Sequence, residues 1–452
     1  MKLTSVSAAQ LLAAVARLQP ASGASNSSSK APTLPLSSDS TFNFDFLIPL
    51  GLALTGGSDI SPVLGVANNV EPGNMTSYYE EFYKLANCTK KQAEDPENAY
   101  DPINVRDTWF STANYFRRAD FLIHQNWSNP DIMTLWAEQT SAFNKAIAAL
   151  PIPGKRIRIP ARKQNFTIEA IWYGASTSKT AELPTLVVGN GFDAAQEDSY
   201  HNFCAPAVLR GWNCITYEGP GQNTVRRYQD VGFIPQWEDV GTPVVDWLYE
   251  NKAHVVDKDR LTILGNSLGS LLALRVAAFE PRIKAVVAID GIWDFYKSAI
   301  APLPADLVPL FEAGKKQEFD SKLLELRATN QLSTMAAWGL DQGLWSFYTH
   351  SPFEFITKAK EYEVSDFVKK IKVPVFIGNG EFDVFVTGQP ATLKQALGIL
   401  GTLHDFNGTA GYHCQTGATQ EMVRSFFAWL NKTFPKHVTH YRRCCNGRKT
   451  LS

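Results

Sequence analysis

The sequence predicts an α/β protein built on a mostly parallel sheet, with a helical region before the sheet and a helical insertion late in it. Three observations support this prediction. The chain has 452 residues, more than one domain usually holds. Short Val/Ile/Leu runs ending in glycine or an acid alternate with helical segments, as in parallel sheets covered on both faces. A serine stands between two glycines at the end of one such run.

The first 24 residues resemble a secretory signal peptide. Lys2 precedes a mildly apolar run over 6–16, and small residues follow at 21–24. The alternative is a disordered N-terminal extension. Seven Asn-x-Ser/Thr sites, against about three expected by chance, favour the secretory pathway or secretion over a cytoplasmic location. These sites are Asn26, Asn74, Asn87, Asn126, Asn165, Asn407 and Asn431.

Helical spacing dominates the next part of the chain. Residues 25–41 are rich in Ser, Pro and Ala and are expected to form a linker. Over 42–150, segments such as 77–88 and 105–125 place apolar residues three and four positions apart, with no convincing strand. We expect a helical N-terminal region here. At the other end, residues 436–452 form a basic tail that is expected to be flexible.

The α/β core is expected over 151–435 and begins with a hairpin. Residues 156–174 alternate apolar and polar positions on either side of a polar turn. Continuous apolar runs then follow, with predicted helices such as 239–252 and 270–280 between them. The predicted strands of the parallel sheet are 185–191, 213–219, 261–267, 284–290, 373–380 and 402–407.

One connection is much longer than the sheet needs. About 80 residues separate the runs at 284–290 and 373–380, whereas a crossover needs about a dozen. This insertion, about 291–370, is aromatic and helical in spacing, so we expect a lid over the strand ends. The alternative is a side domain without a role in function.

The glycine-flanked serine is the strongest candidate for chemistry. Gly265-Asn-Ser267-Leu-Gly269 follows a predicted strand and opens a predicted helix, the setting of a nucleophile elbow. In such sheets an acid and a histidine follow the serine, each after a later strand. Asp383 and His413 fit that order, and we predict a Ser267–His413–Asp383 triad.

Two rivals to these residues remain. Asp290 ends the preceding predicted strand, where some hydrolases carry their acid, and Asp383 could instead serve as a turn or cap residue. His404 competes with His413, but it lies inside a predicted strand and is expected to be a packed or surface residue.

Backbone and aromatic groups complete the predicted site. The N–H groups of Leu268 and Phe192 are expected to hold a developing oxyanion. Glu218, at a strand end, is expected to orient substrate or only to cap the following turn. The lid aromatics either line a pocket or pack in the core; they are Trp293, Trp338, Trp345 and Tyr348.

Composition excludes several other classes of protein. A net charge of -1 gives no basic surface for nucleic acid, and no stretch is apolar enough to span a bilayer. Six cysteines fit one or two disulfides whose pairing is open, and none has metal-ligand spacing, so we expect no metal and no cofactor. A small hydrophobic substrate is the expected partner, and a homodimer is left open.

Five motifs in order, NGFDAAQED, TYEGPGQN, GNSLGS, GEFDVF and AGYHCQTGA, resemble the α/β-hydrolases with an N-terminal helical domain. That group includes fungal hydrolases of polyketide pathways, among them the fusarin type, and the bacterial hydrolase of 2,6-dihydroxypseudooxynicotine. The resemblance spans roughly 78–430 and implies a triad on Ser267, Asp383 and His413, with a pocket between helical domain and core. Asn190-Gly191 departs from the paired glycines of many relatives.

The expected function is therefore that of a serine hydrolase in fungal secondary metabolism. Its substrate is expected to be a polyketide or polyketide–peptide intermediate, cleaved at an ester, amide or carbon–carbon bond by a retro-Claisen reaction. The first alternative is a secreted esterase or lipase for exogenous esters. The second is a non-catalytic binding protein on a hydrolase scaffold.

Overall fold

The computed structural model describes residues 31–434. The predicted signal peptide (1–24), the first part of the predicted linker (25–30) and the predicted tail (436–452) lie outside the described residues. The last part of the predicted linker needs a correction. Helix α2 begins at Ser40, because the Asp39 side chain accepts a hydrogen bond from Phe42 N at 2.9 Å and caps the helix.

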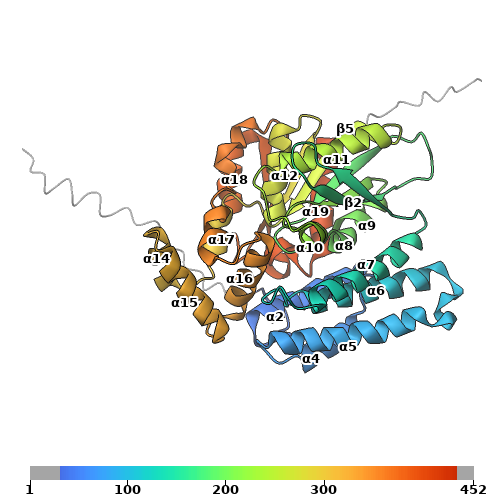
Figure 1. The fold of residues 1–452 in the computed structure, drawn as a ribbon. Helices are drawn as coiled ribbons and strands as arrows, with labels where there is room; N and C mark the ends of the chain where they lie inside the picture. Colours follow the sequence, from blue (N-terminus) through green and yellow to red (C-terminus); the bar gives the residue numbers. More distant parts are fainter. Residues whose placement is uncertain (1–30, 435–452) are drawn as a thin grey trace, which may run out of the picture.

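The helical region lies along one side of the molecule (Figure 1). Its two longest helices, α5 and α6, pack against each other, and α6 also packs on α7. Phe42, Phe46, Tyr78 and Phe82 are fully buried in the interior of this region. The helices are α2 (Ser40–Asp45), α3 (Leu47–Leu52), α4 (Ile60–Asn69), α5 (Met75–Glu94), α6 (Pro102–Asp120) and α7 (Asp131–Ala148).

The core is an eight-stranded sheet in the order β1-β2-β4-β3-β5-β6-β7-β8. β1 pairs with β2 and β2 with β4 in antiparallel fashion, and all other pairs are parallel. The strands are β1 (Lys155–Pro160), β2 (Thr167–Tyr173), β3 (Leu183–Gly189), β4 (Asn213–Glu218), β5 (Val256–Asn266), β6 (Ala285–Ile289), β7 (Val375–Gly380) and β8 (Gly401–Phe406). The mostly parallel sheet is confirmed.

Helices cover both faces of this sheet, which explains the continuous apolar strands. One face packs on α11 (Glu238–Asn251), α12 (Leu268–Phe279) and α18 (Gln389–Leu397). The other packs on α6, α7 and α19 (Thr419–Thr433), so the helical region contributes directly to the main core. β4 and β6 are buried at every position as a result.

The long connection between β6 and β7 is helical. It contains α13 (Phe295–Ile300), α14 (Val308–Glu312), α15 (Lys316–Ala328), α16 (Thr334–Ser346) and α17 (Pro352–Ala359). In Figure 1, α14 and α15 extend away from the sheet, and α16 lies between the sheet and the helical region. Over residues 31–434, no helix combines the length and apolarity needed to cross a membrane.

Candidate active site

A sharp turn between β5 and α12 presents Ser267. Ser267 has a positive φ of 54°, which a non-glycine residue adopts only under constraint. The flanking glycines leave no room for side chains. A Cβ at Gly265 would meet the Gly269 carbonyl oxygen at 1.9 Å, and a Cβ at Gly269 would meet the Asn190 carbonyl oxygen at 2.6 Å. The turn has the geometry expected for a nucleophile elbow.

Three predicted side chains meet at the carboxyl ends of the parallel strands. His413 Nε2 lies 2.9 Å from Ser267 Oγ, and His413 Nδ1 lies 2.7 Å from Asp383 Oδ2. Asp383 follows β7, and its Oδ1 accepts hydrogen bonds from the N–H groups of Phe385 and Val386 at 2.8 and 3.2 Å. These bonds fix the carboxylate with one oxygen free for the imidazole.

A second carboxylate contacts the same imidazole nitrogen. Asp290, directly after β6 and fully buried, places Oδ2 3.2 Å from His413 Nδ1. Its oxygens also accept hydrogen bonds from Cys414 N and from Gln415 Nε2, the latter at 2.8 Å. Asp290 therefore ties down the loop that carries His413, while Asp383 makes the shorter contact.

Electrostatics in this cluster favour a protonated imidazole. Burial alone would lower the pKa of His413, but the carboxylates of Asp383 and Asp290 hold it well above its ordinary value. Burial raises the pKa of Asp383, with Asp290 adding to the effect. Burial would also raise the pKa of Asp290, but hydrogen bonds from His413 and Cys414 N keep it below its ordinary value.

The loop after β3 lies against the elbow. A Cβ at Gly191 would meet the Asn266 carbonyl oxygen at 2.8 Å and Leu268 N at 3.3 Å, so only glycine allows this approach. Within residues 31–434, neither Phe192 N nor Leu268 N donates a hydrogen bond to another group. Both N–H groups therefore have the capacity to bind a ligand oxygen.

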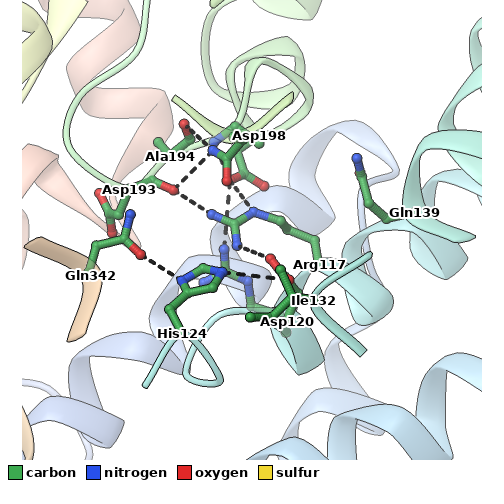
Figure 2. A network of polar contacts seen from close by, with 12 residues as sticks. Arg117, Asp120, His124, Ile132, Gln139, Asp193, Ala194, Asp198 and Gln342 are labelled. Atoms are coloured by element: carbon green, nitrogen blue, oxygen red, sulfur yellow. Dashed lines mark hydrogen bonds and ion pairs between the residues drawn. The ribbon is translucent and has the colours of Figure 1, made fainter. Parts of the chain in front are cut away.

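A polar network holds this loop from behind (Figure 2). The Arg117 guanidinium donates to the Asp193 carbonyl oxygen, and Asn223 Nδ2 donates to the same oxygen at 3.3 Å. Gln342 Nε2, from α16, donates to the Phe192 carbonyl oxygen at 3.2 Å. The loop is thus fixed by the helical region, the core and the insertion together.

The network continues into the helical region through a buried ion pair. Arg227 Nη2, on α10 (Asn223–Gln229), lies 2.7 Å from both carboxylate oxygens of Asp120. The same Nη2 donates to His124 Nε2 at 3.0 Å, and His124 Nδ1 then donates to Gln342 Oε1 at 2.8 Å. Burial alone would raise the pKa of Asp120, but Arg227 and His124 hold it well below its ordinary value. The sequence analysis did not predict this network. The feature that could have indicated it is the pair Arg117 and Arg118, two charged residues within an aromatic-rich helical segment.

A cavity of about 360 Å³ opens at Ser267 and His413. Its wall is mainly apolar and comes from three parts of the chain: Phe44 on α2, Trp338 on α16, and Phe385 after β7. A second arm of about 100 Å³ shares Ser267 and His413, and its wall mixes apolar side chains with the charged groups of Arg118, Asp193 and Asp198. Phe44 lies in the predicted helical region (42–150), and the resemblance implied a pocket between that region and the core; only the first two residues of α2 fall in the predicted linker.

Not all predicted binding residues reach the cavity. Trp338 lines it, whereas Trp293, Trp345 and Glu218 do not. Trp345 instead stacks on His124, with ring centroids 5.2 Å apart. Glu218 is fully buried and accepts hydrogen bonds from Gln196 N and Thr224 N at 3.0 and 2.9 Å, which is the capping role that the sequence left open.

The two remaining candidates from the sequence, Tyr348 and His404, lie outside the cavity wall and the Ser267–His413 cluster. Tyr348, the fourth lid aromatic, is exposed, and its ring stacks on Trp127 outside the cavity wall. His404 lies in β8, with its ring 4.6 Å from that of Phe406, and is not part of the cluster. Its placement is that of a packed residue, as the sequence indicated.

The structure also shows which described cysteines are paired and which side chains lie close enough together to bind a metal ion. Cys204 and Cys214 form a disulfide, Cys88 and Cys414 are free, and Cys444 and Cys445 lie outside the described residues. Among residues 31–434, one group has metal-ligand proximity: Asp290, His413 and Cys414 offer ligand atoms within 4.8 Å of one another. Both His413 nitrogens and both Asp290 oxygens already contact protein groups, so these donors are engaged.

A mostly parallel sheet with a Gly-x-Ser-x-Gly turn after β5 is the architecture of the α/β-hydrolases, and the chain is a member of this class. The family described as X-Pro dipeptidyl-peptidase (S15 family) matches residues 170–404. The chain belongs to that family and is a hydrolase.

Relatives of similar length are fungal hydrolases. Hydrolase LUC6 of a Fusarium species is 28% identical over 407 residues, which is 87% of this chain and 96% of that protein. The 20-hydroxy-prefusarin hydrolase FUS2 of Gibberella moniliformis is 27% identical over 410 residues, with the same coverage of 87% and 96%. The predicted resemblance to fungal hydrolases is confirmed.

The fold is also found in a solved bacterial structure. The 2,6-dihydroxy-pseudo-oxynicotine hydrolase matches with a TM-score of 0.65 at 18% identity, covering 85% of this chain and 95% of that chain. This match confirms the predicted α/β-hydrolase fold.

Proposed function

We propose that this protein is a serine hydrolase whose triad is Ser267, His413 and Asp383. The observation that carries the proposal is the bridging imidazole, 2.9 Å from the Ser267 hydroxyl and 2.7 Å from the Asp383 carboxylate. A serine hydroxyl is a weak nucleophile until a base removes its proton, and this arrangement supplies that base. Asp383 is the proposed acid because its contact with Nδ1 is shorter than that of Asp290 at 3.2 Å.

The first half of the proposed reaction forms an acyl-enzyme. Ser267 Oγ attacks the substrate carbonyl carbon while His413 Nε2 takes the hydroxyl proton. The carbonyl oxygen becomes an oxyanion, which the N–H groups of Leu268 and Phe192 stabilise. The bond to the leaving group then breaks, and His413 returns the proton to the leaving oxygen, nitrogen or carbon.

The second half regenerates the enzyme. Water loses a proton to His413 and attacks the acyl carbon, and a second oxyanion forms at the same N–H groups. Ser267 Oγ leaves with the proton from His413, releasing a carboxylic acid. The same sequence serves an ester, an amide or a retro-Claisen cleavage, because the three differ only in the atom that accepts the proton.

The proposed substrate is a hydrophobic polyketide or polyketide–peptide intermediate of fungal secondary metabolism. The aromatic wall of the larger cavity, which includes Phe44, Trp338 and Phe385, supports an extended apolar ligand. The fungal relatives, one of them a 20-hydroxy-prefusarin hydrolase over 96% of its length, support the pathway class.

Labelling with a fluorophosphonate tests the chemistry. The folded protein is expected to incorporate one equivalent at Ser267, located by mass spectrometry, while the Ser267→Ala protein incorporates none. Absence of labelling in the folded protein would contradict the serine mechanism and favour the non-catalytic binding protein.

Gene deletion in the host tests the substrate class. Accumulation of an unprocessed polyketide in the deletion strain supports the tailoring role. Unchanged metabolites, together with loss of hydrolysis of exogenous esters from the culture medium, would favour the secreted esterase. An X-Pro dipeptide anilide is a useful comparison substrate in vitro, because the family carries that name.

A further inference from the structure

The small arm of the cavity has a feature that hydrolysis alone does not explain. Its wall is partly apolar, but it also contains charged and polar groups of Arg118, Asp193, Asp198 and Asn202, besides Ser267 and His413. The larger cavity also reaches Ser267 and His413 but is mostly apolar. A substrate bound at Ser267 can therefore place an apolar part in one arm and a polar part in the other.

Arg118 is the unusual group in this arm. It is 1% exposed, and over residues 31–434 its Nε and Nη1 atoms have no hydrogen-bond partner. Its nearest carboxylate oxygen, Asp198 Oδ2, is 3.7 Å from Nη2 and also lies 3.5 Å from Arg117 Nε. Buried donors without an acceptor are costly, so such a group in a cavity wall indicates an acceptor supplied by a ligand.

The charges around the arm indicate that this acceptor is neutral. The carboxylates of Asp45, Asp193 and Asp198 all act on Arg118. Arg117 is the second cation beside Asp198. The three carboxylates outnumber the two guanidinium groups, and burial together with Asp193 already raises the pKa of Asp45 to about 7. A further anion would therefore add repulsion without a free positive charge to offset it.

We propose that the small arm binds an uncharged oxygen acceptor of the substrate, a ketone or amide carbonyl within a few bonds of the scissile carbonyl, through hydrogen bonds from Arg118. This inference rests on the proposed function for the position of the scissile bond. It narrows the substrate class to molecules with an apolar body and a second carbonyl group near the cleaved bond. Hydrogen bonds from a charged donor to such a group discriminate strongly against an analogue that lacks the oxygen.

Two isosteric esters test the proposal without needing catalysis. The naphthylmethyl esters of 4-oxopentanoic acid and 4-methylpentanoic acid differ at C4 alone, where the carbonyl oxygen of the first is replaced by a methyl group and a hydrogen, and the naphthyl ring suits the apolar arm. Dissociation constants are measured by calorimetry on the Ser267→Ala protein, which cannot turn the esters over. The oxo ester is expected to bind at least about tenfold more tightly.

Arg118→Met in the Ser267→Ala background is expected to remove this preference by weakening the oxo ester alone. Arg275→Met is the control. Arg275 lies on α12, away from both arms, and its Nε forms an ion pair with Glu238 Oε2 at 2.6 Å. This substitution should leave the preference for the oxo ester unchanged.

Equal affinity of the two esters for the Ser267→Ala protein overturns the proposal, even if Arg118→Met fails to fold. A preference that persists in a folded Arg118→Met protein also overturns it. Failure of fluorophosphonate labelling would overturn the proposed function separately, since binding to the Ser267→Ala protein does not depend on the nucleophile.

Discussion

At the scale of single residues, the unusual feature is one imidazole nitrogen that faces two carboxylates. A triad needs only one acid, and Asp383 lies at the shorter distance from His413. Asp290 also binds Cys414 N and Gln415, so its main effect is on the position and charge of the His413 loop. The two acids should therefore differ in how their removal affects catalysis.

Asp383→Asn is expected to lower kcat by about ten-thousand-fold, because an amide at this position favours the wrong tautomer of the imidazole. Asp290→Asn should lower kcat by only about tenfold, since Asp383 still orients His413. Steady-state kinetics with an activated ester measure both effects. A larger loss in the Asp290 variant would identify Asp290 as the triad acid.

The pH dependence of kcat/KM follows from the raised pKa of His413. The imidazole acts as a base only when neutral, so the acid limb of the profile should have its inflection above the ordinary histidine value. Asp290→Asn removes a negative charge beside Nδ1, lowers the pKa of His413 and should move the inflection to lower pH. An unchanged inflection would show that Asp290 does not act on the imidazole.

At the scale of elements, the elbow and the oxyanion loop are held together by close backbone contacts. A Cβ at Gly269 would meet the Asn190 carbonyl oxygen at 2.6 Å. Gly269→Ala should therefore displace the loop that carries Phe192, lower kcat by about a hundredfold and destabilise the fold by about 1–3 kcal/mol. The kinetics and urea unfolding measure the two effects.

The control for this substitution is another glycine in a helix. Gly65 lies within α4 with open space around its Cβ position, so Gly65→Ala should leave kcat unchanged and stabilise the protein by about 0.5–1 kcal/mol. Full activity in the Gly269→Ala protein would contradict the proposed role of the loop contact.

The ion pair between α6 and α10 is expected to matter for stability. Asp120 and Arg227 are fully buried, and Asp120→Asn leaves a guanidinium without its partner, which should cost about 3–5 kcal/mol of unfolding free energy. Because the pKa of Asp120 is lowered in the folded state, this contribution is present at neutral pH and is lost as the pH falls. Lys84→Met, at an exposed pair, should not shift the urea midpoint, and an equal shift in both variants would contradict the expectation.

A helix or strand could be predicted where the pattern of its own residues indicated it, and not where it depends on contacts with distant parts of the chain. All eight strands left a local signal. β1 and β2 showed the alternation of a half-buried hairpin, and central strands such as β4 and β6 showed continuous apolar runs because both of their faces are buried. The start of β5 at Val256 was missed because the run 257–260, Asp-Lys-Asp-Arg, is charged. The first two residues of α2 were assigned to the linker because the burial of this helix depends on packing with α5, which no local pattern reveals.

At the scale of the whole molecule, the cavity is shared by the helical region, the core and the insertion. The proximity of Ser267, His413 and Asp383 could be predicted because chain order and strand ends place them together. The second contact of Asp290 and the small arm at Arg118 could not, since they depend on how α6 and the His413 loop approach each other in space. Three of the four predicted lid aromatics, Trp293, Trp345 and Tyr348, do not line the cavity. Trp345 and Tyr348 instead stack on His124 and Trp127, partners that are distant in the sequence.

Two features of the structure are relevant to the cellular compartment of the protein: the exposure of its Asn-x-Ser/Thr sites and its disulfide. Of the six Asn-x-Ser/Thr sites within residues 31–434, five asparagines are exposed, and Asn87 on α5 is half-buried. Cys204 and Cys214 form a disulfide, which persists in oxidising compartments. Both features favour the secretory pathway, which we keep as a proposal.

Expression in a fungal host with a C-terminal tag tests that location. The protein is expected in the medium with its N-terminus near residue 25, and enzymatic removal of N-glycans should reduce its mass. Asn165→Gln, in the exposed β1–β2 turn, should remove one glycan, because the turn offers the transferase an accessible acceptor. Asn98→Gln, outside any such site, is the control and should leave the mass pattern unchanged. An unglycosylated protein that stays in the cell with Met1 intact would place it in the cytoplasm and leave the sites without a role.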